Sequence, residues 1–448
     1  MRSRIVCISD VLTSQRLDVT YHSEDQFLHG FVPLSNYISI NGGKRLPKGK
    51  TFSSEKTSYL YLRLADIVDL DNIDYTKLPF ISETIFNTLK RYEIKEGEVS
   101  ISIAGTIGKV FITKNIPMGK RVILTENCAV IRPKAQSLSP IFLKLLLNCT
   151  FVQQQIKRNS IQTTIPKIGL DRIGKLRIPV IPPVHIQENI INIYTKAQEA
   201  KQAKDKEAKS LLDSIDDYLI EKLHLDDIIK ERQETLCLMS NLSSLIGGRL
   251  DPHQFHTERI ETIESIKKGE WCSLKEVVNE IRTTSSQLNS TYIGMENING
   301  NTGDYLPIKE NMSICSSTVI FSKGNILFPK LRPYLNKVHR AQFSGCCSTE
   351  FHVFEAHDIN PDFLTIILRS SFVLAQTKHL MTGNTLPRLQ TTDIDNLIIP
   401  YPEVETQEEI VNTVHGIRNK VNRLQEEGAK LLEKAKQEIE KLILGKYE

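Results

Sequence analysis

The sequence lacks long hydrophobic runs, cysteine motifs and a large net charge, and each absence excludes a class of protein. No stretch of about 18 apolar residues occurs in this chain of 448 residues, so we expect a globular protein without a membrane span. The apolar stretch within residues 1–12 is too short for a secretory signal. Its 8 cysteines are scattered without a CxxC pair, which fits a reducing compartment and argues against a cysteine zinc site. We therefore expect a cytoplasmic protein.

Motifs for catalysis are also missing. The sequence contains no GxGxxG after a strand, no HExxH, no GxSxG, and no Asn/Asp-Pro-Pro-aromatic tetrad of the adenine methyltransferase type. Residues 105–109 (GTIGK) resemble a phosphate loop, but two residues too few separate the glycines, and Val110 stands where a hydroxyl is required. His253 and His256 form an HxxH without partners at ligand spacing, so we interpret them as part of a loop rather than a metal site. The pattern favours binding over catalysis.

What the sequence does contain is an internal repeat of about half its length. Residues 165–168 (IPKI) return at 386–389 (LPRL), and residues 182–190 (PPVHIQENI) return at 402–410 (PEVETQEEI). Weaker matches extend toward the N-terminus: residues 16–18 with 249–251, 61–67 with 292–298, 108–110 with 336–338 and 125–126 with 349–350. Such a long period indicates two related domains rather than a solenoid of many short units.

The repeat divides the chain into two heads and two spacer helices. We expect a first head at residues 1–182, a central spacer helix at 183–225, a second head at 226–401 and a C-terminal spacer helix at 402–448. Within each head, short strands precede a helix that begins after Ser139-Pro140 or Asn360-Pro361, and a short apolar strand follows. The predicted fold class is α+β: two homologous heads of mixed α and β structure, separated by an antiparallel pair of long coiled-coil helices with pseudo-two-fold symmetry.

Apolar residues in both spacers follow a heptad spacing, which predicts that the two helices pack against each other. A two-fold relation between the heads would make the pair antiparallel. The residues predicted on this seam are Ile190, Tyr194, Leu211 and Ile215 in the central spacer, and Ile410, Val414, Ile417, Val421, Leu424 and Leu431 in the C-terminal spacer. Residues 198–209, rich in Ala and Lys, give the thinnest seam; they are interpreted as a solvated face or, alternatively, as a surface for a partner.

Positive charge is concentrated in the first head, which favours a polyanionic partner. Residues 1–182 contain 26 Lys and Arg against 15 Asp and Glu, whereas residues 226–401 contain 17 against 20. Lys and Arg suit phosphates, and Arg also suits a guanine edge. The candidate DNA-binding residues are Lys44, Arg45, Lys48, Lys50 and Lys109 in the first head, and Arg282, Thr284, Ser286, Gln287, Lys330, Arg332, Tyr334, Asn336 and Lys337 in the second. For any one of them, a solvated loop or turn is an equally good interpretation.

The order head, helix, head, helix, with each helix introduced by a proline-rich junction at 178–190 or 399–410, resembles the DNA specificity subunit of type I restriction-modification enzymes. Similar strings occur in that family at residues 61–67 (YLRLADI), 102–110 (SIAGTIGKV), 331–338 (LRPYLNKV) and 348–351 (STEF). The resemblance implies a non-catalytic subunit whose two target-recognition domains each read one half of a split site in double-stranded DNA. The helices would set the spacer and dock two methyltransferase subunits, and a translocating restriction subunit could join them.

The same resemblance implies no cofactor in this chain: S-adenosylmethionine would belong to the methyltransferase partner, and ATP with Mg to the restriction partner. One departure is the net negative charge of the second head, which would gain little affinity from counterion release. Two other classes of function remain open. A two-headed scaffold would bind proteins without reading DNA, and an autonomous enzyme would need catalytic residues that the sequence does not offer.

Overall fold

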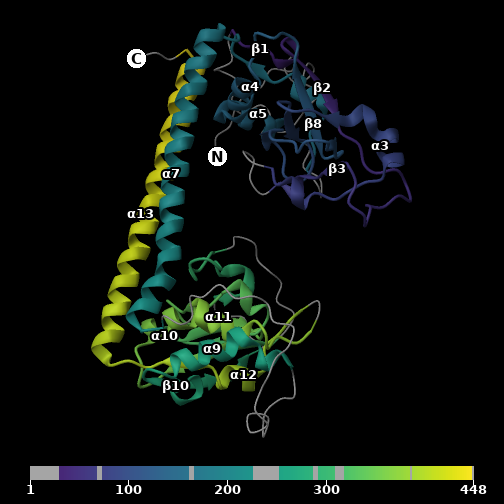
Figure 1. The fold of residues 1–448 in the computed structure, drawn as a ribbon. Helices are drawn as coiled ribbons and strands as arrows, with labels where there is room; N and C mark the ends of the chain where they lie inside the picture. The colour runs from purple at the N-terminus through teal and green to yellow at the C-terminus, as the bar shows by residue number, and fades with distance from the viewer. Residues whose placement is uncertain are drawn as a thin grey trace. The chain divides into compact units, whose positions relative to one another are not determined.

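A computed structural model describes residues 30–67, 73–160, 166–225, 252–285, 291–307, 317–383 and 386–445, without the side chains of residues 252, 253 and 285. The repeat segments at 16–18 and 249–251 and the candidates Ser286 and Gln287 lie outside these ranges. The chain forms two compact units, Met1–Ala203 with Glu427–Glu448, and Lys204–Glu426. Each unit contains one head and a part of both long helices (Figure 1). Within the described ranges, no helix combines the length and apolarity needed to cross a bilayer.

The first head is a mixture of short strands and short helices, as the α+β prediction requires. Its 3-10 helices are η1 (Leu34–Asn36), η2 (Leu64–Asp66), η3 (Tyr75–Lys77) and η4 (Lys90–Tyr92), and its α-helices are α3 (Glu83–Leu89), α4 (Pro140–Asn148), α5 (Thr150–Asn159) and α6 (Leu170–Gly174). Its strands are β1 (Val32–Pro33), β2 (Ile38–Gly42), β3 (Tyr59–Leu62), β4 (Glu93–Ile94), β5 (Val99–Ser102), β6 (Val110–Ile112), β7 (Arg121–Leu124), β8 (Cys128–Pro133) and β9 (Arg177–Ile178).

The second head is likewise a mixture of short strands and short helices. Its 3-10 helices are η6 (Pro252–Phe255), η7 (Leu274–Glu276), η8 (Met295–Asn297) and η9 (Pro333–Leu335), and its α-helices are α9 (Thr257–Ile266), α10 (Pro361–Leu368), α11 (Ser371–Thr377) and α12 (Thr391–Asp395). Its strands are β10 (Trp271–Ser273), β11 (Val278–Ile281), β12 (Thr284–Ser285), β13 (Tyr292–Ile293), β14 (Thr318–Phe321), β15 (Ile326–Pro329), β16 (His339–Arg340), β17 (Gly345–Ser348), β18 (Phe351–Ala356) and β19 (Ile398–Pro400).

Strand order shows that the two heads share one topology. The first head has sheets β1-β9, β2-β8-β5-β6 and β3-β7-β4, and the second has β10-β19, β11-β18-β15-β16 and β12-β14-β17-β13. The matched segments 61–67 and 292–298 overlap β3 and β13, which belong to the third sheet of their heads. Each of these strands runs parallel to its neighbour, β3 to β7 and β13 to β17. The repeat seen in the sequence is therefore a repeat of the fold. The second head differs by the additional edge strand β12.

Two buried glutamines explain part of the repeated sequence. Gln187 Oε1 accepts from the backbone N–H of Ser139 at 3.0 Å, and its Nε2 donates to Pro182 O at 2.9 Å. Gln407 does the same in the second head, accepting from Asn360 N at 2.9 Å and donating to Pro402 O at 2.8 Å. Each glutamine thus fixes the start of a long helix to the start of α4 or α10.

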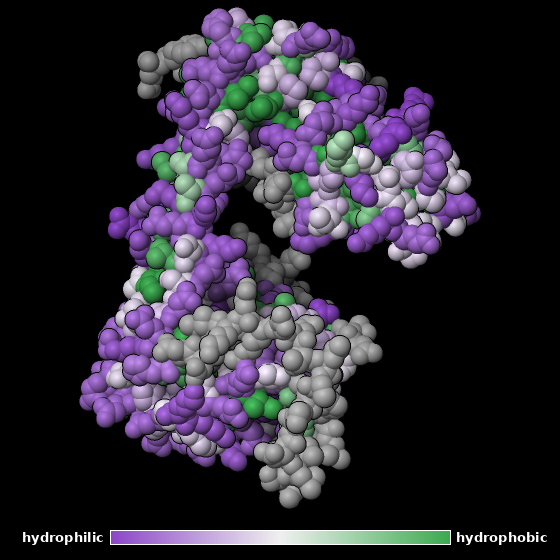
Figure 2. Space-filling view, viewed as in Figure 1, coloured by the Kyte–Doolittle hydropathy of each residue, from purple (hydrophilic) through white to green (hydrophobic). Residues whose placement is uncertain are grey.

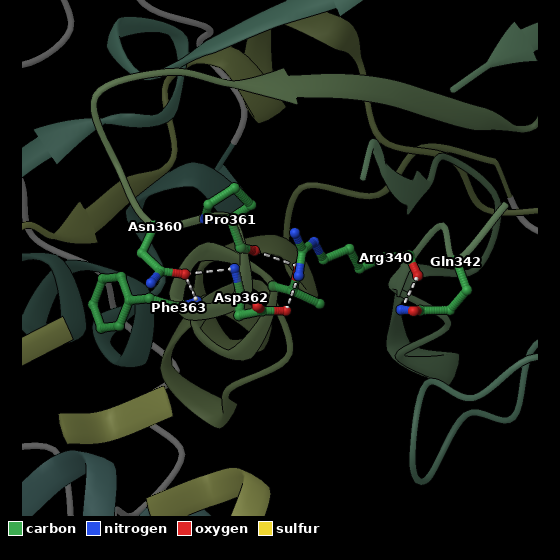
Figure 3. A network of polar contacts seen from close by, with 7 residues as sticks. Arg340, Gln342, Asn360, Pro361, Asp362 and Phe363 are labelled. Atoms are coloured by element: carbon green, nitrogen blue, oxygen red, sulfur yellow. Dashed lines mark hydrogen bonds and ion pairs between the residues drawn. The ribbon is translucent and has the colours of Figure 1, made fainter. Parts of the chain in front are cut away.

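The start of α10 is capped by its own side chain as well. Asn360 Oδ1 accepts from the backbone N–H groups of Asp362 at 2.9 Å and Phe363 at 3.2 Å, and Arg340 from β16 pairs with the Asp362 carboxylate (Figure 3). An acidic residue in the first helical turn also complements the helix dipole. In the first head Ser139 occupies the cap position without a side-chain hydrogen bond.

The sequence predicts a single helix after each of the caps Ser139-Pro140 and Asn360-Pro361. This prediction is wrong, because each segment forms two helices, α4 with α5 and α10 with α11. Cys149, with φ −59° and ψ 145°, separates α4 from α5, and the N–H groups of Thr150 and Phe151 donate to the Glu440 carboxylate at 3.1 Å each. In the second head the N–H of Ser371 at the start of α11 donates to Asp216 Oδ1 at 3.0 Å. A carboxylate from a long helix therefore satisfies the exposed donors that each break creates.

The two long helices are α7 (Val184–Lys222) and α13 (Val404–Ile443), and they lie side by side. In the second unit Lys222 Nζ pairs with Glu409 at 2.6 Å and Glu207 with Lys420 at 3.3 Å, so rising numbers in α7 meet falling numbers in α13. In the first unit Lys201 lies against Gly428, and the seam residues Ile190 and Tyr194 share a core with Ile439 and Ile443. The helices are antiparallel within both units, as predicted.

Most predicted seam residues lie between the helices or against a head. Ile190, Tyr194, Ile410, Val414, Val421 and Leu424 are buried, and Leu211, Ile215 and Ile417 are partly buried. Ala208 is fully buried against Val421 and Leu424, so the Ala-rich stretch is where small side chains let the helices close. The side of the helix pair turned to the viewer in Figure 2 is mostly hydrophilic, with a few separate hydrophobic residues.

The prediction for Leu431 is wrong: its side chain is 40% exposed. After Leu424 the stripe continues through the buried or partly buried residues Gly428, Leu432, Ala435, Ile439 and Ile443, in steps of four, four, three, four and four. This four-residue insertion into the heptad locally unwinds the supercoil, and the stripe moves by one position. At the start of the shift the helices approach closely: a Cβ at Gly428 would lie 3.2 Å from Lys201 Cγ.

Each head completes its core with both long helices. In the first head the core of β2, β5, β6, β8, α4 and α5 includes Ile190 and Tyr194 from α7 and Ile439 and Ile443 from α13. In the second head the corresponding core includes Leu219 and Ile220 from α7 and Ile410, Val411 and Val414 from α13. Burying such aliphatic side chains stabilises the fold by about 1.5–3 kcal/mol each.

Candidate nucleic-acid interface

The basic loop of the first head leaves β2 at a fixed point. Gly43 N donates to Cys128 O at 2.9 Å, and a Cβ on Gly43 would lie 2.0 Å from the carbonyl oxygen of Thr125, so only glycine fits. The carbonyl of the next residue, Lys44, accepts from the Tyr61 hydroxyl at 2.8 Å. The loop then presents four cations from this anchored start: Lys44, Arg45, Lys48 and Lys50.

An aromatic ring and a further arginine lie close to this loop, and neither was predicted from the sequence. The ring of Phe52, 37% exposed, lies 5.7 Å from that of Tyr61, and the Arg63 guanidinium lies 5.2 Å from the Phe52 centroid. Asp66 holds Arg63 through two hydrogen bonds of 2.6 and 2.8 Å. Arg63 belongs to the YLRLADI string, which was the signal available in the sequence. Cations beside an exposed ring suit a polyanion that also carries flat bases.

One acidic residue occupies the same place in each head. Glu126 lies 3.4 Å from Arg45 Nε and 3.4 Å from the Tyr61 hydroxyl. Its repeat counterpart Glu350 accepts two hydrogen bonds from Arg388, at 2.7 and 2.9 Å. The Arg388 hydrogen bonds lower the pKa of Glu350, so this carboxylate stays charged. The glutamate of the repeated Thr-Glu pair therefore lies next to an arginine in both heads.

In the second head Arg282, directly after β11, is part of a hydrogen-bonded triad with Glu280 and His352. Arg282 Nη2 lies 2.6 Å from Glu280 Oε2, and Glu280 Oε1 lies 2.6 Å from His352 Nδ1. Burial lowers the pKa of His352 to about 4, although its hydrogen bond to Glu280 opposes the shift. The Arg282 side chain remains 73% exposed, so its free edge faces solvent. Thr284, also exposed, belongs to strand β12.

The loops at 104–109 and 331–337 share two backbone features in spite of their different sequences. Gly105 and Gly108 adopt left-handed φ values of +74° and +85°, and Arg332 and Asn336 adopt +49° and +51°. Gly105 N donates to Pro166 O at 3.0 Å, and Arg332 N donates to Pro387 O at 2.9 Å, which explains the repeated IPKI and LPRL segments. The exposed Lys109 follows the first loop. No feature of this loop reproduces the GxxxxGK pattern of a phosphate loop.

The predicted positive cluster of the second head divides into two groups. Lys330, partly buried, donates its backbone N–H to Glu350 O at 2.8 Å and so lies near Arg388 and Arg332. Asn336 and Lys337 instead use their side chains inside the head: Asn336 Nδ2 donates to Arg369 O at 2.8 Å, and Lys337 Nζ donates to Met295 O at 2.6 Å.

Asn336 and Lys337 line a cleft of about 1010 Å³ within the second unit. The 45% exposed Tyr334 also borders this cleft, and Asp205, Asp213 and Arg418 line it from the long helices. Arg369 closes one wall with hydrogen bonds of 2.7–3.1 Å to four backbone carbonyls, those of Gly300, Asn301, Asn336 and Val338. Burial lowers the pKa of Arg369 to about 10, which still leaves it charged near neutral pH.

A family model described as type I restriction modification DNA specificity domain matches residues 32–209 and again residues 255–434. The chain is 21% identical over 383 residues to the type I restriction enzyme MjaVIII specificity subunit of Methanocaldococcus jannaschii, which covers 83% of this chain and 84% of that protein. It is 28% identical over 120 residues to the type I restriction enzyme EcoDI specificity subunit of Escherichia coli, 27% of each chain.

Similar solved structures include the S subunit of a type I restriction-modification system from M. genitalium. That chain is 14% identical, with a TM-score of 0.40, and the match covers 92% of this chain and 95% of the other. The HsdS subunit from Thermoanaerobacter tengcongensis is 16% identical, with a TM-score of 0.34 and coverage of 93% and 97%. Because the family model covers most of both halves, the resemblance inferred from the sequence is confirmed. The chain belongs to the family of type I restriction-modification DNA specificity domains, as a non-catalytic specificity subunit with one such domain in each half.

Proposed function

We propose that the first and second heads each read one half of a bipartite site in double-stranded DNA. The observation that carries the proposal is that one topology presents unlike surfaces at the same position. After β2 the first head presents the basic loop with Lys44, Arg45, Lys48 and Lys50, and after β11 the second head presents Arg282 and Thr284. A shared scaffold with different side chains is what the reading of two different half-sites requires.

The two surfaces would contribute to DNA binding in different ways. Four cations of the basic loop in the first head can neutralise phosphates, and Arg45 can also donate two hydrogen bonds to guanine. The second head has a net negative charge over residues 226–401, so it relies on Arg282, Lys330 and Arg332 for positive charge and on Thr284 for uncharged hydrogen bonding. Phosphate contacts would position the complex, and contacts with base edges would give it specificity.

We further propose that the helix pair fixes the spacing between the half-sites and docks the methyltransferase subunits. Support comes from the antiparallel pairing, which is present in both units. Methylation would then take place in the partners, which flip the target base out of the duplex and bind S-adenosylmethionine. A restriction subunit with ATP and Mg would act in the same assembly.

Salt dependence of DNA binding tests the role of the basic loop. In the complex with its methyltransferase, replacing Lys44, Arg45, Lys48 and Lys50 by Gln should weaken binding and reduce the slope of log K against log salt by up to about 3.6, or 0.9 for each lost phosphate contact. The matched control exchanges Lys and Arg at the four positions and keeps the charge. It should retain the slope and lose discrimination at one base pair if Arg45 reads guanine. An unchanged slope in the Gln variant would refute the assignment.

Exchange of one head tests the division of labour. Replacing residues 226–401 by the second head of another family member should change one half of the methylated sequence and leave the other half and the spacer unchanged. Mapping of methylated adenines across a genome or plasmid library gives the readout. A two-headed protein scaffold would show no sequence change at all, and a change in both half-sites would contradict independent reading.

A further inference from the structure

Three side chains of metal-binding type meet on the second head, apart from the surfaces described above. His256 directly precedes α9, Glu258 lies in the first turn of α9, and His379 follows α11. Their ligand atoms all lie within 4.8 Å of one another. Figure 1 places the labels of α9 and α11 on neighbouring helices of this head, and the two helices are in contact. The sequence pattern paired His256 only with His253, whose side chain lies outside the described residues, and His379 is 123 positions away in the chain.

The two imidazoles of the cluster are stacked on each other. Their ring centroids lie 3.6 Å apart and their planes are 12° apart. A neutral imidazole binds metals through the lone pair of its unprotonated nitrogen.

One nitrogen of the cluster is left without a partner. His256 Nδ1 is buried, and no hydrogen-bond partner for it exists among the described residues. A buried polar atom without a hydrogen bond destabilises the fold, so such an atom calls for a water molecule or an ion. The other members do have partners: Glu258 Oε2 lies 3.0 Å from His379 Nε2 and 2.6 Å from Lys378 Nζ.

We propose that His256, Glu258 and His379 bind one divalent transition-metal ion of the zinc type, which joins the start of α9 to the segment after α11. Two imidazoles and one carboxylate form a donor set that suits zinc, copper or nickel better than magnesium or calcium. Three protein ligands leave a fourth position for water. The ion would satisfy His256 Nδ1 and place a positive charge beside the Glu258 carboxylate.

The cluster needs only local rearrangement to bind the ion. Bonds of about 2.0–2.2 Å in a tetrahedral site place ligand atoms about 3.4 Å apart, so the present spread of up to 4.8 Å must contract by about 1.4 Å. One imidazole must also turn out of the stack so that its lone pair points at the ion. The Lys378 ammonium, on a side chain that is 39% exposed, must leave Glu258 and move into solvent.

Zinc titration of the full chain tests the site. The chain competes with a coloured zinc chelator, and each of the variants His256→Ala and His379→Ala should bind zinc at least about 10-fold more weakly, since even loss of an outer partner costs 10–100-fold. The matched control is His357→Ala, because His357 is also near a carboxylate, Asp358 at 3.1 Å, but has no third ligand among the described residues. Circular dichroism confirms that the variants are folded. Unchanged zinc affinity in both ligand variants, or equal loss in the control, would overturn the proposal.

A second variant keeps all three ligands, so its result does not depend on whether the fold tolerates the loss of a histidine. Lys378→Ala removes the ammonium that competes for Glu258, so zinc should bind more tightly than to the wild type, and magnesium should still not compete. Cobalt added to the wild-type chain should give the absorption of a tetrahedral site, which should saturate at one equivalent and be lost in His379→Ala. This measurement reports the geometry of the site rather than its affinity. Weaker zinc binding by Lys378→Ala, or no zinc binding by the wild-type chain, would refute the site.

Discussion

Single buried side chains hold the last strand of each head. Gln376, 1% exposed, donates from Nε2 to Ile398 O at 2.8 Å and accepts from Ile398 N at 3.0 Å. Gln155 makes the same pair of bonds with Arg177 in the first head, both at 2.8 Å. One amide side chain thus replaces a missing neighbouring strand.

Substitution of this amide should be costly. We expect Gln376→Ala to destabilise the second head by about 2–3 kcal/mol, because it leaves the Ile398 N–H and carbonyl without their partners. Hydrogen exchange of the β19 amides in the full chain measures the effect. The exposed Gln342, labelled in Figure 3, is the matched control, and Gln342→Ala should change stability by less than about 0.5 kcal/mol. Equal protection of β19 in both variants would contradict this role.

His352 makes the stability of the second head depend on pH. Its pKa falls from 6.5 to about 4 on folding, so between these values the unfolded chain binds a proton that the folded chain does not. Stability from this residue is therefore constant above pH 6.5 and decreases as the pH falls toward 4, by up to about 3 kcal/mol. Urea unfolding at about pH 7, 5.5 and 4.5 should show the loss. His352→Gln, which does not titrate, should reduce it, and an equally steep loss in this variant would exclude His352 as the cause.

The candidate DNA-binding residues show how far side-chain chemistry can be predicted. Lys48 and Lys50 are exposed, as a flexible basic loop implied. Asn336 and Lys337 could not be distinguished from such residues by sequence, because only the fold brings Arg369 and the Met295 carbonyl within their reach. The same is true of His379, which folding brings to Glu258.

Among the elements, two glycines of α13 differ in their surroundings. Gly428 faces Lys201 of α7, whereas a Cβ at Gly416 would meet no atom of the described residues within 4 Å. Glycine costs a helix interior about 1 kcal/mol relative to a good helix former. Gly416→Leu should therefore stabilise the chain by somewhat less than that.

The same change at Gly428 should have the opposite sign. Leucine there must push α13 away from α7, which costs about 1–3 kcal/mol and outweighs the gain in helix propensity. Thermal unfolding of Gly428→Leu beside Gly416→Leu measures the difference. If both variants gained stability equally, the close approach at Lys201 would be wrong.

Helices were predicted best where the spacing of apolar residues is regular. They were predicted least well where a contact with a residue far away in the sequence is involved. The heptad found Ile410, Val414 and Val421 because one face of α13 is buried throughout that stretch. It misplaced Leu431, because the buried stripe passes from Gly428 to Leu432, a four-residue step that the heptad does not contain. At the break after Cys149 the donor groups are satisfied by a distant residue, the Glu440 carboxylate, which the local sequence does not reveal.

For the whole molecule, the proposed spacing role gives a prediction about length. Seven residues removed from α7 around Ala208 and seven from α13 around Val421 shorten both helices by about 10 Å, close to three base pairs of DNA. Seven residues are nearly two turns, so the orientation of the residues beyond each deletion changes by only about 20°. The preferred spacer in the methylated sequence should then shorten by about three base pairs.

Removal of seven residues from α7 alone is the control. It leaves seam residues of α13 facing the wrong positions, so assembly with the methyltransferase should fail. A spacer that stays the same after the double deletion, in a complex that still methylates DNA, would exclude the helix pair as the element that sets spacing.

The sharing of Ile439 and Ile443 by the core of the first head has a consequence for biosynthesis. On the ribosome, the strands and helices of that head emerge long before α13 does. At ~5–20 residues per second, the roughly 260 residues between Ile178 and Ile439 take about 13–50 s to be translated. During this interval the nascent first head exposes an apolar groove beside Ile190, which makes it a natural client for chaperones until the distant helix arrives.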